Sequence, residues 1–203
     1  ILAVIATQRA HILDVHMDED HNRTVITVAG PPQVVSEAIF RAITVAAEHI
    51  DLTQHTGQHP RIGATDVVPF VPLRGVTLAD CVALTKQLGQ RVGDELNLPV
   101  YLYEEAATDS LRKNLANIRR GGYEQLQARI DAYDTMRPDF GPTKVGPAGA
   151  VVIGARGPLI AFNAYLDTDD IEIAGQIARQ VRESSGGLRF LKAIGLKVGG
   201  RAQ

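Results

Sequence analysis

The order strand, strand, helix, strand occurs twice along this chain, and this repeat constrains the fold more than any other feature. In the first copy, residues 11–16 and 23–29 alternate apolar and polar side chains, as half-buried strands do. Pro31 and Pro32 then open a helix with apolar residues at i, i+3 and i+4 spacing, and residues 65–71 predict the next strand. Mixed sheets covered by helices are the natural packing for this order.

Two more elements follow before the second copy. Thr77 and Asp80 have the spacing of a capping box, which predicts the start of a helix that Pro99 ends. Residues 100–103 then predict a strand, and residues 109–120 predict a shorter helix with leucine and isoleucine on one face.

The second copy predicts strands over residues 150–155 and 159–163, a helix over 169–183 and a strand over 188–198. It stops before a further helix, which suggests truncation. The sequence therefore predicts an α/β (α+β) fold. We expect two subdomains with mixed sheets, helices on the outer faces, a ferredoxin-like strand and helix order, and a truncated second subdomain.

Residues 138–149 are the predicted connection between the two halves. This stretch holds three prolines and three glycines in twelve residues, too many for a helix or a central strand. We therefore expect subdomains over residues 1–137 and 150–203. Because the chain starts without methionine and inside an apolar pattern, we expect the first strand of the first subdomain to be missing.

Composition excludes several classes of partner. The chain has 203 residues and a net charge of −2, which gives no general reason to expect nucleic acid or an anionic membrane. No apolar stretch approaches the roughly twenty residues that span a bilayer, and residues 1–6 lack the basic leader of a signal peptide. Cys81 is the single cysteine, so an internal disulfide is excluded. This cysteine content is compatible with a reducing compartment.

His59 is the leading candidate for chemistry. Pro60 and Gly63 break any helix around it, and an apolar run follows directly. A loop at the edge of a buried strand is a common place for reactive groups, and an imidazole titrates near neutrality, as a general acid or base must. From the residues alone, a structural loop histidine is an equal alternative.

The histidine spacing does not favour a metal site. His55 and His59 are four residues apart, as helical metal ligands are, but Gly57 and Pro60 argue against a helix there. We therefore expect no metal.

Arginines are the candidate anion-binding groups. A guanidinium grips a carboxylate in a bidentate fork, although a solvated surface role is the better expectation for any single arginine. Arg61 and Arg156 stand out because rigid turns flank both. The glycines of the connection allow a flat heterocycle to approach the backbone, and a plain hinge is the alternative.

These stretches together resemble the formiminotransferase domain family, whose activity is glutamate formimidoyltransferase. The resemblance lies in residues 20–25, 59–70, 99–103, 138–142, 154–156 and 159–163, in the order of the family. The block His59-Pro60-Arg61 is its most specific part.

The resemblance implies transfer of a formimino group from N-formimino-L-glutamate to tetrahydrofolate, a co-substrate, in histidine catabolism and one-carbon metabolism. It implies His59 as the catalytic general acid and base. Arg61, Arg156 and Asn22 are the expected substrate contacts. The expected folate-binding residues are Gly141, Pro142, Thr143, Lys144, Val145, Gly146, Pro147, Ala148 and Gly149. A cytoplasmic homodimer or larger homo-oligomer is expected, with no nucleic acid or membrane partner.

Two alternatives stay open. One is a folate-binding fragment or regulatory domain without turnover, and the other is a variant that accepts a formyl donor. The sequence does not distinguish oxygen from nitrogen at the transferred carbon.

Overall fold

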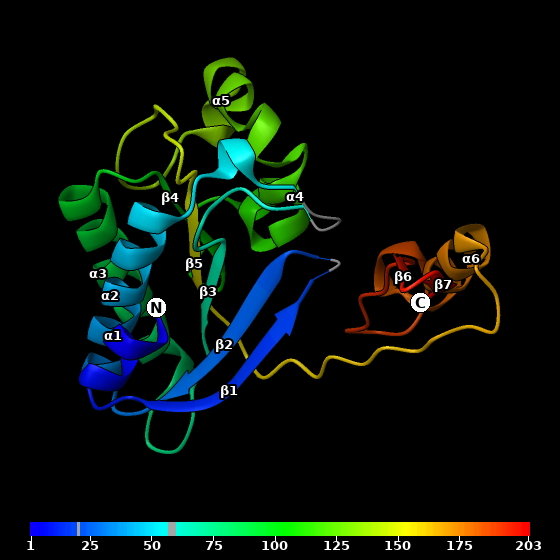
Figure 1. Cartoon of the computed structure of the whole chain (residues 1–203), viewed down its shortest axis with the longest axis horizontal. Coiled ribbons are helices and arrows are strands. Elements are labelled where there is room, and N and C mark those ends of the chain that lie inside the picture. Colours follow the sequence, from blue (N-terminus) through cyan, green and yellow to red (C-terminus); the bar gives the residue numbers. More distant parts are fainter. Residues whose placement is uncertain (20, 57–59) are drawn as a thin grey trace. The chain divides into compact units, whose positions relative to one another are not determined.

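A computed structural model describes residues 1–19, 21–56 and 60–203 of the chain (Figure 1). Its contacts divide the chain into two compact units, Ile1–Pro158 and Leu159–Gln203, which are described separately. The α/β class with parallel and antiparallel strands is confirmed. The helices of the first unit are α1 Leu2–Thr7, α2 Pro32–His49, α3 Leu78–Leu96, α4 Leu115–Arg119 and α5 Gly122–Ala132, with short 3-10 turns at Leu52–Gln54, Ser110–Lys113 and Asp134–Met136. Its strands are β1 His11–Asp18, β2 Arg23–Ala29, β3 Val67–Phe70, β4 Val100–Glu104 and β5 Val151–Ala155.

A three-stranded parallel sheet in the order β3-β5-β4 forms the centre of the first unit. We expected residues 150–155 to open the second half of the chain, but β5 lies between two strands of the first half. All five residues of β5 are buried, as is typical of a parallel strand covered on both faces. Among the described strands, the parallel and antiparallel pairings lie in separate sheets. The expected subdomain limits stay a prediction.

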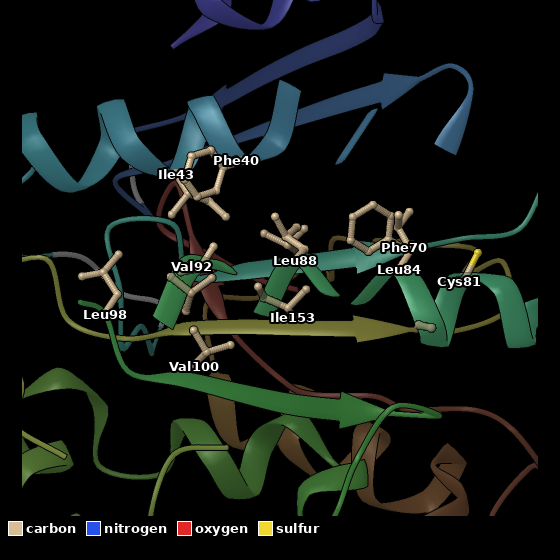
Figure 2. Packing of buried hydrophobic residues seen from close by; sticks show 13 residues of the cluster. Phe40, Ile43, Phe70, Cys81, Leu84, Leu88, Val92, Leu98, Val100 and Ile153 are labelled. Atoms are coloured by element: carbon tan, nitrogen blue, oxygen red, sulfur yellow. The ribbon is translucent and has the colours of Figure 1, made fainter. Parts of the chain in front are cut away.

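Helices cover both faces of this sheet, and the side chains of β5 alternate between them (Figure 1). Val151 and Ile153 pack into a core with α2 and α3, which Figure 2 shows around Leu88 and Val92. Val152 lies on the opposite face, in a core with α4 and α5. Parallel strands need crossover connections, usually helices, because the chain must return to the same end of the sheet before the next strand begins.

The antiparallel pair β1–β2 forms its own two-stranded sheet. Ile12, Ile26 and Val28 pack against a third core made by α1 and α2, which includes Ile5 and Ala38. The hairpin is thereby attached to the helices rather than hydrogen-bonded to the central sheet.

Local signals predicted some elements well and others badly. The capping box of Thr77 and Asp80 is present at the start of α3, with both reciprocal hydrogen bonds. The helix expected over residues 109–120 is instead a 3-10 turn followed by α4. Asn114 caps α4 by accepting a hydrogen bond from the Ala116 N–H, because a short amide side chain favours a cap over a helix interior.

The second unit contains α6 Ile171–Val181, a 3-10 turn at Glu183–Ser185, β6 Lys197–Val198 and β7 Arg201–Ala202. Ala174 and Ala178 are the residues of α6 that are buried. The strand predicted over residues 159–163 is wrong, and so is most of the strand predicted over 188–198. Ile160 and Phe162 are 92% and 87% exposed, because within this unit no described strand pairs with their segment.

Candidate functional site

His59 itself lies outside the described residues, and so do Gly57 and Gln58. Its neighbours on either side, residues 51–56 and 60–66, are described and are called here the His59 flanks. These flanks contact the β1–β2 turn, α4, the start of α5, β5 and the residues predicted to bind folate, 141–149, which are called here the connection 141–149.

Asn22 joins the β1–β2 turn to the first flank. Its backbone is left-handed, with φ of 47°, a conformation that asparagine tolerates in turns. Its side-chain amide donates to the Thr56 carbonyl at 2.8 Å, and its own carbonyl lies 3.0 Å from His55 Nε2. Because a carbonyl only accepts, His55 carries a proton on Nε2. Asn22 is thus placed beside the loop that holds His59.

Arg61 is held by Glu124 of α5. Its two terminal nitrogens donate to the two carboxylate oxygens at 3.0 and 2.7 Å, and one of them also donates to the His55 carbonyl at 2.7 Å. The Arg61 side chain is 15% exposed and that of Glu124 is 60% exposed. The hydrogen bond from Arg61 lowers the pKa of the Glu124 carboxyl below its usual value.

Asp66 stabilises the second flank through hydrogen bonds to its carboxylate. Its carboxylate accepts from the Ile62 N–H at 2.8 Å and from the guanidinium of Arg119 in α4. In addition, the Tyr123 N–H at the start of α5 donates to the Arg61 carbonyl at 2.8 Å. The flank that follows His59 therefore rests on the helices of one face of the sheet.

The connection 141–149 runs along the His59 flanks. The Leu52 N–H donates to the Pro147 carbonyl and the Ala64 N–H donates to the Ala148 carbonyl, both at 2.9 Å. The Ala150 N–H donates to the Ile62 carbonyl at 2.8 Å. These bonds place the predicted folate-binding segment and the predicted catalytic loop side by side.

Glycine has two different uses in this segment. A Cβ added at Gly149 would lie 2.1 Å from the Ile62 carbonyl oxygen, and one at Gly141 would lie 2.0 Å from that of Leu98. Both glycines also have positive φ, so they serve close backbone packing. A Cβ at Gly146 would meet nothing within 4 Å, and this glycine lies beside open space.

Arg156 lies away from the other predicted contacts. It directly follows β5, where its N–H donates to the Phe70 carbonyl, and its side chain donates to the Gly157 carbonyl at 2.9 Å. Burial raises the pKa of Tyr103, and the nearby charge of Arg156 opposes this. At about 3.3 Å per strand residue, Arg156 and Ala150 are about 20 Å apart along β5. Arg61 is therefore at one end of the strand and Arg156 at the other.

In the part of the chain that the structure describes, no group of three or more His, Cys, Asp or Glu residues could hold a metal ion. Two cavities, of about 340 and 420 Å³, open elsewhere in the first unit. The larger is lined by Arg112 and Arg129, whose side chains donate largely to backbone carbonyls.

No helix in the described ranges is long and apolar enough to cross a membrane.

Glu124 and Gln127 were not singled out from the sequence, whereas the carboxylate of Asp66 was noted beside His59 and Arg61. The Arg61–Glu124 pair spans 63 residues of chain, so no local pattern could indicate it. Asp66 belongs to the same motif as His59, and its position after the glycine turn was the one available signal.

Comparison with known proteins places these features in a family. Residues 1–156 match the model of the formiminotransferase domain, N-terminal subdomain. The chain is 46% identical to a glutamate formimidoyltransferase of Streptococcus pyogenes over 92% of its own length and 62% of the relative's. It is 48% identical to the enzyme of that name from Thermoplasma acidophilum, over 95% of this chain and 64% of the relative. With the mouse formimidoyltransferase-cyclodeaminase it shares 45% identity, over 91% of this chain and 34% of the relative. The chain spans less than two thirds of the length of these relatives.

Proposed function

Because this chain belongs to the formiminotransferase domain family, matching its N-terminal subdomain, we propose that it transfers the formimino group from N-formimino-L-glutamate to tetrahydrofolate. The products are 5-formiminotetrahydrofolate and glutamate. The names of the relatives support the donor and the transferred group, and the geometry of the His59 flanks supports where the reaction takes place.

The observation that carries this proposal is that the connection 141–149 lies beside the His59 flanks and is hydrogen-bonded to them. A transfer between two bound molecules needs both sites within reach of one acid–base group. The bonds from Leu52 and Ala64 to Pro147 and Ala148 bring the segment assigned to folate next to the loop assigned to catalysis.

His59 is the proposed general base and general acid. N5 of tetrahydrofolate attacks the amidine carbon of the donor and forms a tetrahedral centre. The imidazole takes the proton that N5 loses and then gives it to the departing glutamate nitrogen as the carbon–nitrogen bond breaks. The proton count balances with one histidine, and no metal is needed.

Asn22 and one of the two arginines, Arg61 or Arg156, are the proposed contacts of the donor. Asn22 and Arg61 lie at the His59 flanks, whereas Arg156 lies at the far end of β5. The two carboxylates of one glutamate are too close together for both arginines to hold the same molecule. Since Glu124 already occupies the fork of Arg61, a substrate carboxylate that binds there must share or replace that partner.

The wider setting is part of the proposal. We propose a cytoplasmic homodimer or larger homo-oligomer that acts in histidine breakdown and one-carbon metabolism. Its small-molecule partners are formiminoglutamate and folate, and the proposal includes neither nucleic acid nor a membrane.

The decisive experiment measures tetrahydrofolate-dependent release of glutamate from N-formiminoglutamate by the parent chain and by His59→Ala. We expect the variant to be slower by a hundredfold or more, about the contribution of one acid–base group. His49→Ala is the matched control, because His49 is exposed at the end of α2 and its ring hydrogen-bonds to the Val45 carbonyl of the same helix.

Other outcomes would select the alternatives. A parent chain that binds folate but does not turn over would be a binding or regulatory domain. Faster transfer from N-formylglutamate than from the formimino donor would identify the formyl variant.

A further inference from the structure

Gln127 of α5 holds two backbone groups of the connection 141–149. Its side-chain oxygen accepts from the Val145 N–H at 2.8 Å, and its side-chain nitrogen donates to the Thr143 carbonyl at 3.3 Å. The same nitrogen donates to Asp131 at 2.9 Å, one helical turn further on, which orients the amide. An amide carries a donor and an acceptor on one plane, so it can hold the backbone on both sides of Lys144 at once.

The carboxyl end and the middle of the connection 141–149 are held in different ways. Its carboxyl end is fixed by backbone hydrogen bonds from Leu52 and Ala64 and by a turn in which the Gly149 N–H donates to the Gly146 carbonyl. In the middle of the segment, the Thr143 carbonyl and the Val145 N–H are both hydrogen-bonded by the Gln127 side chain. Within residues 1–19, 21–56 and 60–203, these two backbone groups have no other hydrogen-bond partner. The Gln127 side chain therefore supplies hydrogen bonds to the middle of the segment, where the Val145 side chain also packs against the core.

Gln127 also belongs to a helix that contacts the His59 flanks. Tyr123 lies one turn earlier on the same face of α5, and its hydroxyl donates to the Gly146 carbonyl at 3.3 Å. The Tyr123 N–H donates to the Arg61 carbonyl. α5 thus sets the position of the segment relative to the flanks.

We propose that Gln127 is a positioning residue for the tetrahydrofolate site, acting through the backbone of residues 143–145. This inference rests on the proposed function of the connection as the folate-binding segment. Gln127 does not touch the formimino group. Its loss should weaken folate binding and leave the handling of the donor unchanged.

The test compares three variants of the full chain by direct tetrahydrofolate binding and by steady-state kinetics. Gln127→Ala removes the amide and Gln127→Met keeps the length of the side chain while removing both hydrogen bonds. Gln125→Ala is the control, since Gln125 is exposed on the same helix, and the described hydrogen bonds from this helix to Thr143 and Val145 come from Gln127.

We expect both Gln127 variants to raise the tetrahydrofolate Kd and KM about tenfold, the effect of losing one or two hydrogen bonds. The KM for formiminoglutamate and the kcat at saturating folate should stay within about twofold of the parent, and Gln125→Ala should match the parent. Recovery of folate binding in Gln127→Met would overturn the proposal, because it would assign the effect to packing. An unchanged Kd in Gln127→Ala would overturn it too.

The two proposals fail in distinguishable ways. If the parent binds tetrahydrofolate but does not release glutamate, the transferase assignment fails while the Kd comparison still tests Gln127. If the parent turns over and the Gln127 variants raise both substrate KM values equally, the transferase stands and the positioning role is overturned.

Discussion

Single residues at the candidate site are constrained mainly by backbone packing. A Cβ at Gly63 would lie 1.8 Å from the Ala150 carbonyl oxygen, at the point where the second His59 flank meets the start of β5. Gly149 is equally tight against Ile62. These glycines let two main chains approach each other, which brings the second His59 flank and the connection 141–149 together.

Substitution of Gly63 by alanine should therefore disrupt the site by separating two backbones. We expect Gly63→Ala to lose about 2–4 kcal/mol of unfolding free energy and most of the proposed folate binding, because the overlap is with rigid backbone. Chemical denaturation and folate titration measure the two effects. Gly157→Ala is the control, since a Cβ there meets nothing within 4 Å. A Gly63→Ala variant as stable as Gly157→Ala would contradict this account.

At the scale of elements, α5 is the helix that organises the site. Its Glu124 holds Arg61, its Tyr123 reaches both Arg61 and Gly146, and its Gln127 holds the middle of the connection. All of these residues lie within the first turns of one helix. The site is thus built on an element that packs on the sheet through Leu126 and Ile130.

The pair of Arg61 and Glu124 should make a small, pH-dependent contribution to stability. The pKa of Glu124 is lowered in the folded chain, so the contribution is present above the unfolded pKa and is lost as pH falls through the folded value. Because Glu124 is largely exposed, we expect Glu124→Gln to cost only about 0.5–1 kcal/mol at pH 7.

Unfolding free energies of the parent and Glu124→Gln, measured from pH 7 down to pH 3, check this expectation. The two curves should converge in acid as the parent's carboxyl becomes protonated. Glu48→Gln, at the exposed end of α2, should follow the parent throughout. A gap between parent and Glu124→Gln that stays constant with pH would show that the charge on Glu124 has no part in the effect.

The whole molecule consists of two units with very different burial. In the first unit the central sheet is covered on both faces, and β4 and β5 are almost entirely buried. In the second, large apolar side chains remain accessible on the segment after Pro158 and on α6, among them Ile160, Phe162 and Ile177. Burial of apolar side chains within the unit therefore contributes less to the stability of the second unit than to that of the first.

Limited proteolysis should report this difference directly. Chymotrypsin at low ratio should first cleave after Phe162 or Tyr165, which are 87% and 55% exposed and lie outside any strand or helix. Tyr101 and Tyr103 in β4 should be cut last, because cleavage there requires unfolding of the sheet. Mass spectrometry of the early fragments identifies the order, and early cleavage in β4 would contradict it.

The sequence by itself determined the features that depend on nearby residues. The apolar periodicity of α2 and α3, the capping box at Thr77 and the family resemblance around His59 were all legible without coordinates. Helix faces and caps are set within a few residues, so local pattern is sufficient for them.

The tertiary structure decided which distant segments meet. It placed β5 between β3 and β4, paired Arg61 with a glutamate 63 residues away, and laid the connection 141–149 along the His59 flanks. Within the described part of the second unit, it also left residues 159–163 without a strand partner, although their composition favours a strand. Strand pairing and ion pairing are chosen by contacts across the fold, and the period of a sequence carries no information about the partner.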